Sequence, residues 1–294
     1  REFGRRPKRM NNLETMGLVA VCYPGLDLVR TAPDGFGLSD WRDFLKLALD
    51  FFVRAGGSLA VDKCTRQWVG MRFWRKDLVE RDRLQIAEKE ERRWPRARRS
   101  GLRNHLVRVL AYTFRADIAT DYGEDLVDSV LDAAWKALTE ETGILKSSAG
   151  GRRTLPLEHL AFAPVTGAWV CPITLRFLDT TLRGMTPYLP RQATEATARC
   201  RQVEIPLYDQ PFGGDLDPLA HIGRARDWLR QQDSLEPLRV QGLWQALNDR
   251  VIELAPYYVA AEHSAQQPSD LLARYERAFK QGDLNLLSCS TTME

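Results

Sequence analysis

Near its end the chain carries two short apolar stretches, YYVAA at residues 257–261 and LNLLSC at residues 284–289, which decide its predicted fold. Both are typical of strands buried on both faces of a sheet. Between them, Ser269 stands where it would cap a helix, apolar residues recur at helical spacing, and Gly282 ends the pattern. Strand, helix and strand at this spacing predict a parallel βαβ unit, with Cys289 packed beside the sheet.

Small polar residues follow both predicted strands. The turn EHSAQQ at residues 262–267 comes after the first strand, and Ser290, Thr291 and Thr292 come after the second. In open α/β sheets, phosphates and other ligands bind beyond the carboxyl ends of parallel strands. Hydroxyl groups can donate hydrogen bonds to phosphate oxygens without adding bulk. These three hydroxyl residues are therefore candidate phosphate contacts.

The same region of the chain resembles a family of motor proteins. The stretch FKQGDLNLLSCSTTME at residues 279–294 resembles the entry to motif V of superfamily 2 helicases, and EHSAQ at residues 262–266 is similar to the preceding His-containing turn of that lobe. The form of motif V in this chain is similar to that of large bacterial DEAD/DEAH-type helicases with an uncharacterised C-terminal domain, some of which are encoded in phage-defence loci. The resemblance covers about 40 of the 294 residues.

The resemblance implies that the tail is part of the second RecA-like lobe of an ATP-dependent helicase or translocase. In that lobe Thr291 and Thr292 would lie against the backbone of the bound strand, with Ser290 beside them at the strand end. His263 and Gln266 would line the same face, Gln266 with a hydrogen bond to a phosphate or sugar. From the residues alone, His263 can equally cap the turn between strand and helix.

ATP hydrolysis by such motors needs a phosphate loop, an acidic pair that holds Mg²⁺, and an arginine finger. Neither Gly-x-x-x-x-Gly-Lys-Ser/Thr (Walker A) nor Asp-Glu-x-His (Walker B) occurs, and the sequence ends at Glu294, before the family's Gly-x-Asp stretch and arginine finger. We therefore expect ATP and Mg²⁺ to act in a parent protein whose first RecA-like lobe is the partner. The chain alone is expected to bind neither and to be inactive.

The chain begins at Arg1 without an initiating Met, which predicts a piece cut from a longer protein. Its opening, RRPKRMNNLE at residues 5–14, also resembles the sequence that these helicases show soon after the first strand of the second lobe. Residues 13 to about 235 are therefore predicted to form a mainly helical insertion within that lobe.

Basic residues are concentrated in the first half of the chain, although the net charge is only +3. Residues 66–115 hold fifteen basic and six acidic residues, and tryptophans and a phenylalanine lie among them. Arginine guanidinium groups can bind phosphate oxygens through two hydrogen bonds, and aromatic rings can stack on exposed bases. A mixture of basic and acidic residues is equally typical of a solvent-exposed helix. The aromatic residues are Trp68, Phe73, Trp74 and Trp94. The candidate nucleic-acid contacts, centred on the run RRWPRARRS at residues 92–100, are Arg96, Arg98, Arg99 and Arg103.

Two amphipathic stretches, residues 102–114 and 125–139, precede a strand-turn-strand pattern over residues 144–157. Two helices followed by a hairpin with a Gly/Arg tip are the outline of a winged-helix unit, whose tip commonly rests on a phosphate backbone. Arg152 and Arg153 in the tip are the candidate contacts. The same outline is also widely used for packing alone.

Hydrophobic residues make up 44% and charged residues 28% of the chain, and the apolar stretches are too short to cross a bilayer. Five cysteines without a Cys-x-x-Cys pair favour free, mostly buried thiols in a reducing cytoplasm, with no metal and no membrane partner.

The predicted fold is α+β: a mainly helical insertion with a winged-helix-like unit and β-hairpins, followed by a partial RecA-like parallel α/β unit. The predicted segments are a helical basic region at 1–100, a winged-helix-like and hairpin region at 101–190, a linker and helical region at 191–239, and the partial lobe at 240–294. Further predictions are helices at 9–16, 39–52, 219–232 and 240–254, a strand at 18–23, and a hairpin-like stretch at 159–177.

DNA is the expected nucleic-acid partner, and RNA fits the same residues. A different class of function is a non-enzymatic winged-helix DNA-binding regulator, in which the tail only packs, and a third is a protein-interaction scaffold. A thiol protease built on Cys289, His263 and Glu262 would need an exposed thiolate beside the imidazole, which an apolar strand does not favour.

Overall fold

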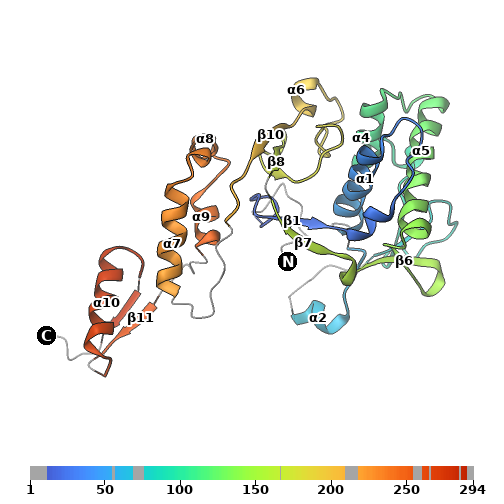
Figure 1. The fold of residues 1–294 in the computed structure, drawn as a ribbon. Coiled ribbons are helices and arrows are strands. Elements are labelled where there is room, and N and C mark those ends of the chain that lie inside the picture. Colours follow the sequence, from blue (N-terminus) through green and yellow to red (C-terminus); the bar gives the residue numbers. More distant parts are fainter. Residues whose placement is uncertain are drawn as a thin grey trace. The chain divides into compact units, whose positions relative to one another are not determined.

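The computed structural model describes residues 12–54, 57–68, 76–165, 167–208, 218–253, 260–264, 266–284 and 286–289 (Figure 1). The chain forms two compact units, Arg1–Ile205 and Pro206–Glu294. Both helices and sheets are present, so the fold class is α+β. Among the described residues, none of the helices combines the length and the apolar character needed to span a membrane.

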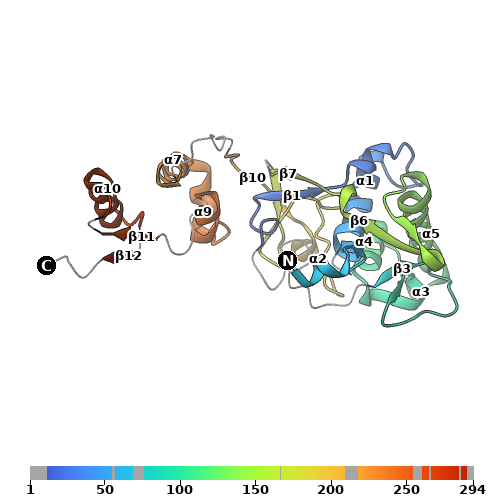
Figure 2. The same cartoon turned by 90° about the horizontal axis from the view of Figure 1, so that it is seen from below.

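Three long helices form the framework of the first unit (Figures 1 and 2). Helices α1 (Leu38–Leu47) and α5 (Asp121–Lys136) each run on into a π-helical turn, Ala48–Arg54 and Ala137–Glu141. The third is α4 (His105–Phe114). The short helices of this unit are α2 (Lys63–Trp68), α3 (Ala97–Ser100) and α6 (Glu195–Ala198), and its 3-10 turns are Pro24–Leu28, Gly101–Arg103, Ala149–Gly151 and Leu157–His159.

Side-chain caps explain where two of these helices begin. The side chain of Asn104 accepts hydrogen bonds from the backbone N–H groups of Leu106 and Val107, which starts α4. Thr120 caps the backbone N–H of Gly123, so α5 begins before the predicted residue 125. Cap hydrogen bonds, rather than apolar periodicity, set these starts.

The buried faces of the three helices meet in one core, as their apolar spacing predicted. The side chains of Phe44, Leu45, Leu106, Leu110 and Leu131 are all no more than 1% exposed. This core joins residues on both sides of residue 100. Truncating such a leucine to alanine lowers the free energy of unfolding by about 2–5 kcal/mol.

The largest sheet of the first unit follows the order β2-β6-β3-β4, with β5 also paired to β6. Its strands are β2 (Leu59–Ala60), β3 (Asp77–Val79), β4 (Glu91–Arg93), β5 (Lys146–Ser148) and β6 (Arg152–Pro156). The predicted hairpin is present as β5 and β6, which pair antiparallel around an exposed glycine turn. Because β6 also pairs with β2 and β3, this hairpin is the centre of a mixed sheet.

The hairpin predicted within residues 159–177 is wrong. Strand β7 (Ala161–Pro164) pairs antiparallel with β1 (Val19–Cys22), which confirms the strand predicted at 18–23. Strand β8 (Gly167–Val170) instead pairs antiparallel with β9 (Phe177–Leu178) and with β10 (Arg201–Glu204). Pro164 and Gly167 therefore mark the passage of the chain from one sheet to another, which a local turn pattern does not reveal. Residues 13–17 form turns instead of the predicted helix.

The second unit begins with α7 (Pro218–Arg230), which confirms the helix predicted at 219–232. The helix predicted at 240–254 is interrupted: α8 (Glu236–Val240) ends at the first residue of that range, and α9 (Ala246–Ile252) begins after Gly242. Gly242 has a φ of 69°, a conformation that favours glycine and breaks a helix. The 3-10 turn Asp233–Leu235 precedes α8.

The last elements are β11 (Ala260–His263), α10 (Ser269–Lys280) and β12 (Leu286–Cys289). The two strands pair in parallel, with His263 opposite Cys289, so the predicted βαβ unit is confirmed (Figure 2). Residues 257–259 of the first predicted strand lie outside the described residues. Burial on both faces is wrong for this chain, because Ala260, Glu262, Leu286 and Ser288 are all exposed.

Candidate nucleic-acid interface

The predicted phosphate contacts Ser290, Thr291 and Thr292 lie outside the described residues. Gln266 lies in the turn after β11 and is exposed. His263, by contrast, is 6% exposed, and its Nε2 lies 2.9 Å from Oε1 of Glu276 on α10. The structure thus places this imidazole within β11 and against α10, rather than on an open face or in the cap of the turn.

Cys289 is exposed, contrary to the prediction that it packs beside the sheet. Strand β12 has its other edge unpaired among the described residues, and only its Leu287 is partly buried. Cys289 is the register partner of His263, but Nδ1 of His263 has no hydrogen-bond partner within the described ranges of the chain. A thiol-protease site needs the imidazole to hold the thiol, so these positions do not form one.

Three of the predicted arginine contacts are paired with carboxylates. Arg96 lies 3.0 Å from Asp82 and 3.3 Å from Asp128. Arg98, at 55% side-chain exposure, lies 2.6 Å from Glu124, and its Nη2 lies 3.2 Å from Asp121. Both arginines therefore have carboxylate partners within the protein, with which a phosphate would have to compete.

Arg152 at the hairpin tip, the third of them, is held in the same way. Its Nε lies 2.7 Å from Oε1 of Glu91, and its Nη2 lies 3.4 Å from Oε2 of Glu90. Glu91 is 3% exposed, and hydrogen bonds from the backbone of Ala87 and from Arg152 lower its pKa. Arg152 therefore compensates a buried carboxylate, which anchors the tip to β4.

Arg103 and Arg153 differ from the other candidates. Arg103 is exposed at the end of the 3-10 turn before α4, and Arg153 is half-buried in β6. Neither guanidinium has a hydrogen bond or ion pair to any residue that the structure describes. Arg99 belongs to α3, but its side chain lies outside the described residues. Among the described residues, Arg103 and Arg153 are the predicted insertion contacts without a carboxylate partner.

The tryptophan within the basic run is part of the core. Trp94 is 2% exposed, donates a 2.8 Å hydrogen bond from Nε1 to the carbonyl of Leu131, and packs against Phe52 and Trp135. It cannot stack on a base in this position. Phe73 and Trp74, and the side chain of Trp68, lie outside the described residues.

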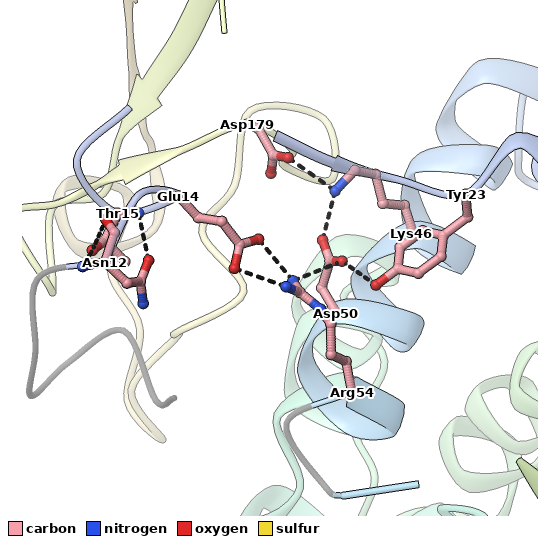
Figure 3. Close-up of polar contacts among 8 residues, drawn as sticks. All are labelled: Asn12, Glu14, Thr15, Tyr23, Lys46, Asp50, Arg54 and Asp179. Atoms are coloured by element: carbon pink, nitrogen blue, oxygen red, sulfur yellow. Dashed lines mark hydrogen bonds and ion pairs between the residues drawn. The ribbon is translucent and has the colours of Figure 1, made fainter. Parts of the chain in front are cut away.

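A buried charge network near α1 was missed by sequence reasoning (Figure 3). Asp50 is at its centre: its carboxylate lies 2.7 Å from Lys46 Nζ and 3.0 Å from Arg54 Nη2, and it accepts a 2.6 Å hydrogen bond from Tyr23. Lys46 also contacts Asp179 at 3.0 Å. Arg54 donates two hydrogen bonds to Glu14. The network joins Glu14 in the first turn, Tyr23 directly after β1, α1 with its π-helical turn, and Asp179 directly after β9.

Three carboxylates and two cations share this network. Burial raises the pKa of Asp50, but Lys46 and Arg54 outweigh burial and the net pKa is lowered. Burial raises the pKa of Glu14 and of Asp179, and the cations offset this only partially. Asp50 is thus the carboxylate that both cations hold ionised, and the π-helical turn sets Asp50 and Arg54 on its inner side.

The sequence did carry a signal for this network. Lys46, Asp50 and Arg54 stand at i, i+4 and i+8 within residues 44–54, which are otherwise apolar, and this spacing places three charges on one face. Charges on the core side of a helix need partners, because an unpaired buried charge is strongly unfavourable. Nothing local identifies Glu14 or Asp179 as those partners. In the described residues, no group of His, Cys, Asp and Glu is placed to hold a metal ion.

Comparison with known proteins finds no matching family model, no similar curated protein and no matching solved structure.

Proposed function

We propose that this chain is part of an ATP-dependent superfamily 2 helicase or translocase and binds nucleic acid. It would contribute contacts from the second motor lobe and from a basic insertion. The observation that carries the proposal is the parallel, in-register pairing of β11 and β12 around α10. The carboxyl ends of these strands, at His263 and Cys289, lie side by side, as the motif resemblance of residues 279–294 requires.

The open sheet face gives further support. Parallel sheets are covered on both faces in complete domains. Here one face of β11 and β12 carries Ala260, Glu262, Leu286 and Ser288, all exposed, and α10 packs against β11 through the His263–Glu276 contact. A βαβ unit with one bare face suits a larger α/β lobe that supplies the missing cover.

The nucleic-acid role is tested by the salt dependence of binding. Binding of a fluorescein-labelled single-stranded oligonucleotide to the chain should weaken as salt rises, because each phosphate contact releases counterions. Arg103→Gln and Arg153→Gln should each flatten the logarithmic salt slope by about 0.7. Arg98→Gln is the matched control, because Glu124 and Asp121 already neutralise Arg98. Absence of binding to single strands and duplexes at low salt would contradict the proposal.

The motor role has a direct check in the coding sequence. The reading frame that contains this chain should encode a phosphate loop with Lys and Ser/Thr on one side, and Gly-x-Asp followed by an arginine finger directly after Glu294. A reading frame with none of these would contradict the motor. DNA is the expected partner, and parallel titrations with DNA and RNA of one sequence distinguish the two.

A second candidate is a non-enzymatic winged-helix DNA-binding regulator. The order α4, α5 and the β5–β6 hairpin favours it, since the hairpin ends in an exposed glycine turn and Arg153 lies two residues beyond Gly151 in β6. On this view duplex DNA would bind more tightly than a single strand, and Arg153→Gln would weaken duplex binding most. Equal or tighter binding of the single strand favours the motor.

A further inference from the structure

A cavity of about 720 Å³ in the first unit is lined by α4 on one side and by the segment from Arg183 to Arg199 on the other. Its volume is typical of pockets that take small molecules. The cavity is rich in positive charge, with two acidic residues among its lining, Asp117 and Glu195. The arginines that line it are Arg108, Arg115, Arg183, Arg191 and Arg199.

Two of these arginines are already engaged. Arg183 lies 2.7 Å from Asp40 and also donates to the carbonyl of Gly35. Arg199 lies 2.9 Å from Glu195 and donates a hydrogen bond to the carbonyl of Arg183. These contacts fix the far wall of the cavity and account for one of its acidic residues.

The other three arginines differ from Arg183 and Arg199. The guanidinium groups of Arg108, Arg115 and Arg191 have no hydrogen bond or ion pair to any residue within the described ranges. Nε of Arg108 is also buried without a hydrogen-bond partner there. Burial and the nearby positive charge of Arg191 lower the pKa of Arg108. Like charges that share one cavity repel each other, and the described residues place no carboxylate in contact with either Arg108 or Arg191.

The spacing on α4 brings the charges together with an aromatic ring. Arg108, Ala111 and Tyr112 stand at i, i+3 and i+4 on α4, so they share one face of the helix. Arg115 follows directly after the last residue of α4, and all four line the cavity. Leu102 also lines it. The cavity therefore combines arginine guanidinium groups, the ring of Tyr112 and the apolar side chain of Leu102.

We propose that this cavity binds the phosphodiester backbone of a single nucleic-acid strand. Arg108 and Arg191 take phosphate oxygens, and Tyr112 lies beside a base or sugar. The inference rests on the proposed function for the source of the phosphate, and it assigns the contact to residues outside the basic run. A single strand suits a recess of this size better than a duplex, whose phosphates lie on a wide convex surface.

The test uses the full chain and a fluorescein-labelled twelve-nucleotide oligothymidylate, followed by fluorescence anisotropy. Arg108→Gln and Arg191→Gln should each weaken binding about tenfold and flatten the salt slope by about 0.7. Arg176→Gln is the control: it removes the same charge from the first unit outside the cavity and should change neither. Thermal melting checks the fold, and Arg108→Gln should melt no lower than the wild type, since it relieves repulsion from Arg191.

Two results would overturn the inference, and they differ in what they leave standing. If the oligonucleotide binds and both cavity variants bind as tightly as the wild type, the cavity is not the contact but the proposed function survives. The second result is that the oligonucleotide does not bind, whereas inorganic pyrophosphate binds to the wild type and to neither variant. The cavity would then bind a different anion. In that case the strand as occupant and the proposed nucleic-acid function both fail.

Discussion

The first unit contains two clusters of charge that are built in opposite ways. Around Asp50, each cation lies against at least one carboxylate, and each of the three carboxylates lies against a cation. In the cavity beside α4, Arg108 and Arg191 face each other with no carboxylate partner among the described residues. Charges that stabilise a fold are paired within it, whereas charges left unpaired in a recess are available to a ligand.

The largest effect is expected at the centre of the paired cluster. Asp50→Asn removes the one carboxylate that contacts both cations, while Asp179 still pairs with Lys46 and Glu14 with Arg54. The loss of two charge-assisted hydrogen bonds, at about 1.5–3 kcal/mol each, should lower the free energy of unfolding by about 3–5 kcal/mol. Urea denaturation measures this. The matched control is Asp34→Asn on the exposed surface, with an expected change within about 0.5 kcal/mol. Equal effects of the two variants would mean that the cluster does not stabilise the unit.

The two clusters can be compared directly with one chemical change. Arg54→Gln removes both hydrogen bonds to Glu14 and should lower the free energy of unfolding by about 3 kcal/mol. Arg108→Gln should leave the free energy of unfolding unchanged or raise it, by no more than about 1 kcal/mol. A loss at Arg108 as large as that at Arg54 would contradict the view that Arg108 is reserved for a ligand.

A smaller effect is expected from pH. Burial, and then the charge of Asp40, raise the pKa of Asp43 to about 6 in the folded state. The folded protein then binds this proton more tightly than the unfolded chain does, so its stability falls as pH rises from about 4 to 6. Asp43→Asn should remove this fall and raise the free energy of unfolding at pH 7 by about 1 kcal/mol, because the group is partly exposed. Urea denaturation from pH 4 to 7 measures the difference, and equal slopes for the two proteins would contradict it.

The smallest change concerns reactivity rather than stability. Cys289 on the open sheet and Cys64 are exposed, whereas Cys171 and Cys200 are buried and burial raises the pKa of Cys200 to about 12. Iodoacetamide and mass spectrometry should therefore find Cys64 and Cys289 alkylated first in the native chain. Protection of Cys289 in this chain would contradict its exposure at the end of β12.

The fold could be predicted wherever one segment of sequence carries the whole pattern. The helix α4, the pair β5–β6 and the unit β11–α10–β12 follow from local periodicity, caps and turns. Strand partners that lie far apart could not be read in this way, as the pairings of β7 with β1 and of β8 with β10 show. Burial of the last sheet was predicted wrongly because an apolar strand signals cover without saying which chain segment supplies it.

The candidate site could likewise be predicted only as far as local sequence shows it. The sequence singled out arginines because many of them occur within residues 92–100. Their carboxylate partners Asp82, Asp121 and Glu124 decide which of them remain available to a phosphate. Arg108 was not singled out, because its neighbours in sequence are apolar and its role depends on Arg191. Composition shows that cations are in excess, and only the fold shows which ones lack a carboxylate.

The central claim is that this chain serves a nucleic-acid motor, and ATP hydrolysis by the complete gene product tests it most directly. With Mg²⁺ and ATP present, hydrolysis should rise several-fold when a single-stranded oligonucleotide is added, and Arg108→Gln should blunt that rise. A gene product that hydrolyses no ATP, or whose hydrolysis ignores DNA and RNA alike, would contradict the account.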